Sequence, residues 1–132
     1  MKSGKKFIAG IAAAAACLSI ATVTAFANTS STPATGYGTL TGTLTSGTNT
    51  AYYTTQVTQN NDNAYLTIAG SIQDQAGKTL VTKQQINSSR GATTFSGSWT
   101  SLPAGAYAVY GTHGVQGGRT YGAYAVYTYT HV

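Results

Sequence analysis

The sequence predicts an all-β protein with one antiparallel β-sandwich of about seven strands. The chain after residue 27 is dominated by Thr, Gly, Tyr, Ser and Ala, and β-branched and aromatic residues suit pleated, half-buried surfaces. Apolar and polar residues alternate with a period of two in several segments, as expected of half-buried strands. Clusters of Gly, Asn, Asp and Pro separate these segments at a spacing of roughly ten residues, which fits short strands joined by turns. A small closed barrel is the alternative architecture.

The N-terminus has the pattern of a secretory signal peptide over residues 1–27. Lys2, Lys5 and Lys6 form a positive region, an apolar stretch begins at Phe7, and Ala25-Phe26-Ala27 matches an A-x-A cleavage site. The alternative is a retained membrane helix, since the apolar stretch is long enough to span a bilayer. We favour cleavage, which predicts a secreted or cell-surface protein of bacterial type with no membrane span in the mature chain.

Cysteine and charge limit what the mature chain can be. Cys17 is the single cysteine and lies in the apolar stretch, with Ala14 where a lipoprotein signal would place a large aliphatic residue. We therefore interpret Cys17 as part of the signal peptide, so the mature chain needs no disulfide and has no thiolate metal site. Its four Lys and Arg residues against two Asp residues leave a net charge of +2. This is too little for a phosphate-binding patch, so we expect no nucleic-acid partner.

Residues 28–35 are predicted to be a flexible polar lead, and residues 36–132 a single domain. The weakly alternating start of this domain suggests an edge strand. In the clearest strand, Leu66, Ile68 and Ile72 share one face, and further along the chain Phe95 and Trp99 share another face that we assign to the core. The predicted strands cover residues 36–46, 50–59, 64–73, 79–86 and 92–100, followed by a hairpin within 105–131.

The hairpin carries one hexapeptide twice, Gly-Ala-Tyr-Ala-Val-Tyr, at residues 105–110 and 122–127. Residues 114–119 between the copies are rich in turn-forming residues. If the turn centres between Gln116 and Gly117, Tyr107 faces Val126 and Val109 faces Tyr124 across the ladder, and these four side chains form a core face.

The other face of this hairpin would be a low floor of alanines surrounded by tyrosines, which could seat a sugar ring or a partner's side chain. The floor consists of Ala106, Ala108, Ala123 and Ala125, and the candidate binding residues are Tyr110, Tyr121, Tyr127 and Tyr129. A purely structural role for the tyrosines is the competing interpretation, and a shift of register by one residue would expose the opposite rings.

The run Leu102-Pro103-Ala104-Gly105-Ala106-Tyr107-Ala108-Val109 resembles the L-P-x-G-x-Y-x-V turn and strand of many extracellular immunoglobulin-like and prealbumin-like modules. The resemblance covers about eight residues and implies a sandwich, with immunoglobulin-like and jelly-roll-like topologies both open. It implies nothing about a ligand.

The inventory of reactive groups argues against catalysis and against a cofactor. Asp62 and Asp74 each lie in a predicted turn, where Asp has a local structural role, so a pair of catalytic carboxylates is not expected. No G-x-S-x-G motif accompanies the serines and histidines. His113 and His131 are expected to be solvent-exposed at opposite ends of the hairpin, too far apart for a metal site, and Ca²⁺ at residues 60–63 would have one carboxylate only.

The sequence thus favours a non-catalytic binding module whose partner is a glycan, the cell wall or a surface protein. One alternative is a self-associating structural subunit of an extracellular matrix, coat or fibre, because low charge and Thr- and Gly-rich strands allow pairing between copies. The other alternative is a small secreted antibacterial protein of the bacteriocin kind, although no cationic amphipathic helix supports it.

Overall fold

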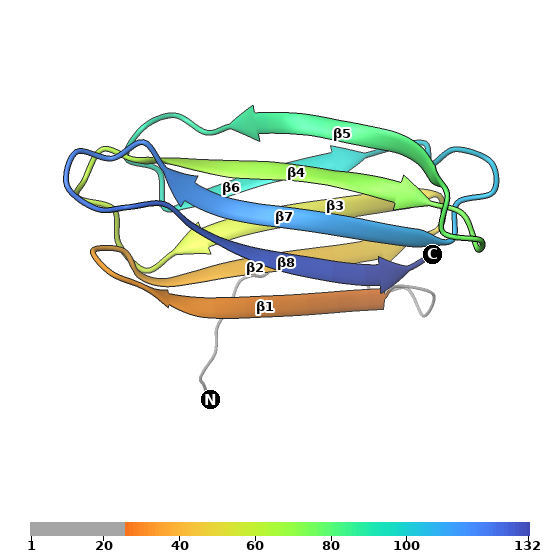
Figure 1. The fold of residues 1–132 in the computed structure, drawn as a ribbon, viewed down its shortest axis with the longest axis horizontal. Coiled ribbons are helices and arrows are strands. Elements are labelled where there is room, and N and C mark those ends of the chain that lie inside the picture. Colours follow the sequence, from red (N-terminus) through yellow and green to blue (C-terminus); the bar gives the residue numbers. More distant parts are fainter. Residues whose placement is uncertain (1–25) are drawn as a thin grey trace.

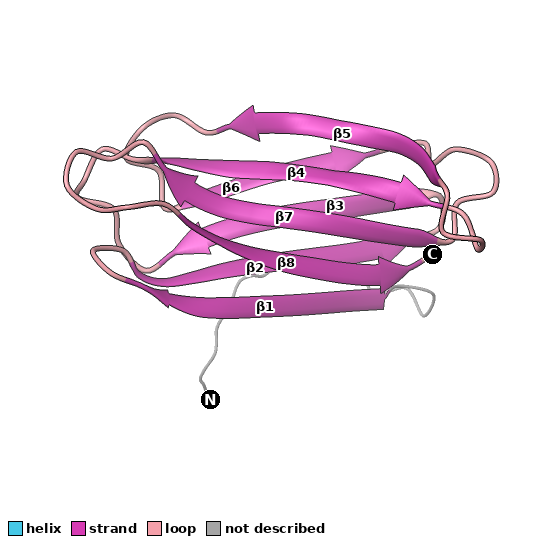
Figure 2. Ribbon diagram, viewed as in Figure 1, coloured by secondary structure: helices cyan, strands magenta, loops and turns pink. Residues whose placement is uncertain are grey.

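The computed structural model describes residues 26–132, and within this range the chain forms eight β-strands and no helix (Figure 2). Every hydrogen-bonded pair of strands is antiparallel. The strands are β1 (Phe26–Ala34), β2 (Gly38–Gly47), β3 (Thr50–Val57), β4 (Tyr65–Gln73), β5 (Thr79–Asn87), β6 (Thr94–Trp99), β7 (Ala108–Gln116) and β8 (Tyr124–His131).

The strands form two four-stranded sheets that lie face to face (Figure 1). One sheet has the order β1-β2-β3-β6 and the other has the order β5-β4-β7-β8. The chain passes from one sheet to the other after β3, β5 and β6, and the remaining connections join antiparallel neighbours. The predicted all-β architecture of antiparallel strands is therefore confirmed, with eight strands instead of about seven.

Side-chain hydrogen bonds link the two sheets along both of their long sides. On one side β1 runs beside β8 (Figure 1), and the Tyr129 N–H donates to Asn28 Oδ1 over 2.9 Å. Nearby, Ser46 Oγ donates to the His131 carbonyl. On the other side Lys83 Nζ of β5 donates to the Ser98 carbonyl of β6 over 3.4 Å.

The core between the sheets consists of two apolar clusters. One cluster contains Leu40, Val57, Leu66 and Val115, and the other contains Leu44, Tyr53, Ile68, Ile72 and Val109. Phe95 and Trp99 pack against these clusters, and Leu66, Ile68 and Ile72 are fully buried, as the sequence predicted. Buried and more exposed positions alternate regularly in β2, β3 and β8, so two-residue periodicity was a reliable guide to the interior in these strands.

A polar layer separates the two apolar clusters. His113 is fully buried there, with Nδ1 3.2 Å from Thr55 Oγ1 and Nε2 2.7 Å from Thr128 Oγ1. The ring fits because Gly42 faces it from β2, where a Cβ atom would collide with the imidazole. The prediction that His113 is solvent-exposed is wrong, because the inward positions of β7 continue from Val109 through His113 to Val115.

The first strand was not predicted. Residues 28–35 were expected to be a flexible polar lead, whereas β1 pairs with β2 along its whole length, from Phe26 opposite Ser46 to Ala34 opposite Gly38. Among residues 28–34 of β1, only Ala34 is buried, so this part of the strand has no apolar alternation that a sequence pattern could detect. Because β1 covers one side of it, β2 is an internal strand and not the edge strand that the sequence suggested.

The predicted signal peptide, residues 1–27, lies outside the described residues except for Phe26 and Ala27, which begin β1. Cys17 also lies outside the described part. Within residues 26–132 there is no helix of the length and apolar character needed to cross a bilayer.

Candidate binding face on strands β7 and β8

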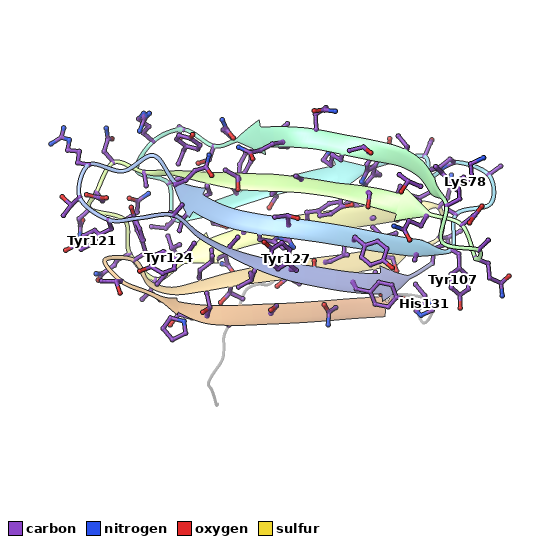
Figure 3. All side chains as sticks on the ribbon, in the orientation of Figure 1. Lys78, Tyr107, Tyr121, Tyr124, Tyr127 and His131 are labelled. Carbon is purple, nitrogen blue, oxygen red and sulfur yellow. The ribbon has the colours of Figure 1, made fainter. Side chains whose placement is uncertain are left out.

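Three of the four candidate tyrosines lie on the outer face of the β7–β8 hairpin. Tyr110, Tyr127 and Tyr129 all point away from the core, and Tyr127 is the most exposed of them, at 70%. Tyr121 lies apart from them, in the loop between the two strands at the far end of the molecule (Figure 3). The structure thus brings three of the predicted residues together and separates the fourth.

The hairpin has a different register from the one expected. Val109 pairs with Thr130 and Val126 pairs with His113, because residues 117–123 form a long loop instead of a tight turn. The pairing moves by an even number of positions, which leaves each side chain on its expected face. Val109 and Val126 are therefore buried as predicted, and the tyrosines of the opposite face remain outside.

The expected position of Tyr107 in the core is wrong. Tyr107 precedes β7 and is 37% exposed. Its backbone N–H donates to the Gln73 carbonyl, and its carbonyl accepts from the Val132 N–H, so the main chain here is held between the ends of β4 and β8. Its ring contacts His131 edge to face, with 4.7 Å between ring centroids.

Four rings pack together at this end of the hairpin and form what we call the aromatic cluster: Tyr107, Tyr110, Tyr129 and His131. Tyr110 and Tyr129 are directly opposite each other in the ladder, with ring centroids 4.9 Å apart. His131 lies 5.2 Å from the Tyr129 ring, and its Nε2 is 2.8 Å from the Tyr129 hydroxyl. His131 is exposed, as predicted.

Tyr127 stands next to the cluster, on the same strand as Tyr129 and His131 and on the same outer face (Figure 3). We call Tyr127 together with the aromatic cluster the aromatic face. Partial burial raises the pKa of the Tyr129 hydroxyl, and the neighbouring Tyr110 and Tyr107 add to the effect. A tyrosine hydroxyl is protonated at neutral pH already at its ordinary pKa of about 10, so it can both donate and accept hydrogen bonds.

The alanine floor predicted beneath the tyrosines does not form. Ala108 and Ala125 are at opposite ends of the hairpin ladder, and Ala106 packs against the core. The shifted register places Thr112 opposite Tyr127, and Ser71 of β4 opposite Tyr110. The surface beside the rings is therefore lined by short hydroxyl side chains.

The loop that holds Tyr121 is organised by Asp62, which the sequence assigned only to a turn. The Asp62 carboxylate is buried and accepts hydrogen bonds from the Thr120 and Tyr121 N–H groups at 2.9–3.1 Å and from the Tyr37 hydroxyl at 2.8 Å. Burial alone would raise the pKa of Asp62, but these hydrogen bonds outweigh it and hold the pKa below its ordinary value. The Tyr121 ring packs edge to face on Tyr37, with 5.9 Å between centroids.

Asp62 is thus a structural anchor in this structure, and its distance in sequence from the loop explains why no local pattern revealed that role. Among residues 26–132, no three His, Cys, Asp or Glu side chains converge in a way that could hold a metal ion.

Comparison with known proteins identifies no relative of this chain. No protein-family model matches the chain, and no curated protein and no solved structure is significantly similar to it.

Proposed function

We propose that this protein is a secreted, non-catalytic β-sandwich module that binds a neutral glycan, free or within a cell wall, through its aromatic face. The observation that carries the proposal is the cluster of exposed rings on β7 and β8. Tyr107, Tyr110 and Tyr129 are each more than a third exposed, and Tyr127 is 70% exposed. Large rings left in water at one place on a small domain typically mark a binding surface.

The chemistry of this surface favours a sugar. Aromatic rings stack against the apolar faces of sugar rings, and tyrosine hydroxyls supply hydrogen bonds at the edge of the contact. Hydroxyl side chains such as Thr112 and Ser71 flank the rings and can meet the hydroxyl groups of a glycan. No charged residue lies on the outward positions of β7 or β8 apart from the titratable His131, so a neutral ligand fits better than an ionic one.

Strand order supports an immunoglobulin-like sandwich. Without β1, the order β2-β3-β6 corresponds to strands A, B and E of immunoglobulin-type domains, which lie in the sheet that faces C, F and G. In this correspondence β4, β7 and β8 take the places of C, F and G, and β5 flanks β4 as strand C′ does. The segment Leu102–Val109 then lies at the corner that leads into strand F, in agreement with its resemblance to such modules.

Retention on insoluble polysaccharides and isolated cell walls tests the binding proposal. The purified protein is mixed with each material, and the fraction retained is compared between the wild type and Tyr127→Ala. We expect retention on one material, release by its soluble sugar, and a large loss of retention in Tyr127→Ala. Because Tyr127 makes little contact with the core, this variant should unfold at the same temperature as the wild type.

Tyr52→Ala is the matched control. Tyr52 is 52% exposed on β3, on the opposite sheet, so its loss removes an exposed tyrosine without touching the aromatic face. Retention that is equally weakened in both variants, or that is unchanged in Tyr127→Ala, would contradict the proposed site. Absence of retention on every material would contradict glycan binding itself.

A further inference from the structure

The sheet opposite the aromatic face has no charged residue in any of its four strands. β1, β2, β3 and β6 contain no Asp, Glu, Lys or Arg. Exposed protein surfaces ordinarily carry about a quarter to a third charged residues. This sheet therefore presents a neutral outer face. Strands β4, β7 and β8 of the other sheet also lack Asp, Glu, Lys and Arg, so the pattern of hydroxyl groups, and not the neutrality alone, distinguishes this face.

Hydroxyl groups cover this face in a regular array. One row crosses all four strands as Thr29, Thr43, Thr54 and Ser96, which are directly paired in the ladders. Hydroxyl oxygens within this row lie 3.4 Å apart both between Thr29 and Thr43 and between Thr54 and Ser96. Neighbouring hydroxyls of this row thus come within hydrogen-bonding distance at both ends of the row.

The next row repeats the pattern on three strands, whereas on β3 it carries the side-chain amide of Gln56 instead of a hydroxyl. It consists of Ser31, Thr41, Gln56 and Thr94, and the hydroxyls of Ser31 and Thr41 lie 3.0 Å apart. Neighbouring strands are about 4.8 Å apart, and alternate residues along a strand are about 6.8 Å apart, so the two rows belong to a two-dimensional lattice of hydroxyls. On β2 the outward positions from 39 to 45 are all Thr.

We infer that the outer face of the β1-β2-β3-β6 sheet binds ice. A hydroxyl both donates and accepts hydrogen bonds, as each water molecule in ice does. Threonine adds a methyl group beside each hydroxyl, which can occupy the spaces between lattice waters. Ice excludes ions from its lattice, so a face free of charge over four strands matches it in charge as well as in hydrogen bonding.

A crystalline polysaccharide fits this face less well. Protein surfaces that hold sugars use aromatic rings for stacking. Within residues 28–132, the one large exposed ring on this sheet is Tyr52, in a row beside the hydroxyl rows. The aromatic rings are gathered on the opposite sheet instead. The ice-binding inference therefore does not depend on the proposed glycan site.

Freezing measurements test the inference directly. Protein purified from cells that express the full chain is added to a droplet containing a single seeded ice crystal. We expect the crystal to become faceted and to stop growing over a temperature interval below its melting point. We also expect slower coarsening of ice grains held just below 0 °C. Round crystals that grow at the melting point, as in buffer, would overturn the inference.

Two substitutions to lysine locate the activity. Thr43→Lys places a charge in the centre of the hydroxyl array and should abolish the growth arrest. Thr82→Lys places the same charge on β5 of the other sheet, at an exposed position, and should leave it intact. If Thr43→Lys does not fold, Ser96→Lys on the edge strand β6 serves instead, since Ser96 is exposed. Equal activity in the wild type and the array variant, or equal loss in Thr82→Lys, would overturn the assignment.

The same variants distinguish the other occupants of this face. Retention on crystalline cellulose that is lost in Thr43→Lys, without any effect on ice, would assign the face to a polysaccharide. Dimers in light scattering that disappear in Thr43→Lys, again without an effect on ice, would assign it to a second copy of the chain. Either result would overturn ice binding.

Discussion

His113 Nε2 lies 2.7 Å from Thr128 Oγ1 in the interior of the protein, between the two apolar clusters of the core. The other ring nitrogen lies 3.2 Å from Thr55 Oγ1. Burial lowers the pKa of His113 to about 4, because a charged imidazolium in this position would lose its hydration. The imidazole is therefore neutral in the folded protein at neutral pH. Through the Thr55 hydroxyl it links β7 to β3 of the other sheet, and through Thr128 it contacts the neighbouring strand β8.

The first prediction is a loss of stability in mild acid. The unfolded chain binds a proton at His113 below pH ~6.5, whereas the folded chain does so only near pH 4, so the free energy of unfolding falls as the pH falls between these values. The loss should reach roughly 3 kcal/mol and should not increase further, as far as His113 is concerned, below pH 4. Urea unfolding followed by Trp99 fluorescence at several pH values measures it.

A His131→Gln variant is the control for this pH dependence. His131 is exposed, so its removal should leave the decrease in stability between pH 6.5 and 4 in place. A stability that is constant across this interval would show that His113 is not buried as described.

The second prediction concerns the space that Gly42 leaves for His113. Gly42→Ala places a methyl group against the imidazole ring and should lower the free energy of unfolding by about 1–3 kcal/mol, as overpacking in a core does. Gly122→Ala is the matched control, because a Cβ there meets no atom within 4 Å and the change should stay within about 0.5 kcal/mol. Denaturant unfolding measures the free energy of unfolding of both variants. Equal values for Gly42→Ala and Gly122→Ala would contradict the close packing of Gly42 on His113.

The third prediction separates the two aspartates. Asp62→Asn weakens the acceptor that holds the β7–β8 loop, so amide hydrogen exchange at Thr120 and Tyr121 should become much faster. Asp74 accepts from Ala76 and Lys78 within its own turn, so Asp74→Asn should change exchange only there. Exchange measured residue by residue by NMR tests both, and unchanged protection of the loop in Asp62→Asn would refute the anchoring role.

The fourth prediction compares two adjacent tyrosines of β3. The buried Tyr53 hydroxyl accepts from Trp99 Nε1 over 2.8 Å, and it lies 3.3 Å from the Tyr110 carbonyl. Tyr53→Phe leaves the indole N–H without this partner and should cost about 1–3 kcal/mol of stability. Tyr52→Phe removes an exposed hydroxyl from the same strand and should be nearly neutral. Thermal unfolding compares the two, and a neutral Tyr53→Phe would be the contrary result.

The residue pattern was informative wherever one face of a strand carries apolar side chains. The period of two in residues 64–73 and 50–59 identified β4 and β3 and their buried faces, and the repeated hexapeptide identified the β7–β8 hairpin. The same pattern placed Tyr110, Tyr127 and Tyr129 outside, because a side chain's face depends only on whether its position is odd or even along the strand.

Long-range contacts decided the rest. The register of the hairpin depends on how long the loop is, and Asp62, far away in the sequence, holds that loop open. His113 is a polar residue of a type often found at the surface, but here it is buried. Gly42 of β2 leaves space for its ring, and Thr55 of β3 and Thr128 of β8 supply hydrogen-bonding partners.

What the sequence determined by itself was the class of fold and the face to which each side chain of a strand belongs, since both follow from local alternation and turn residues. Only the tertiary structure decided that β1 is a strand, that the rings of Tyr110 and Tyr129 meet, and that hydroxyls of four strands align in rows. These features depend on which strands become neighbours and in what register. Backbone pairing decides this between segments that are far apart, and no local sequence pattern indicates which of them will pair.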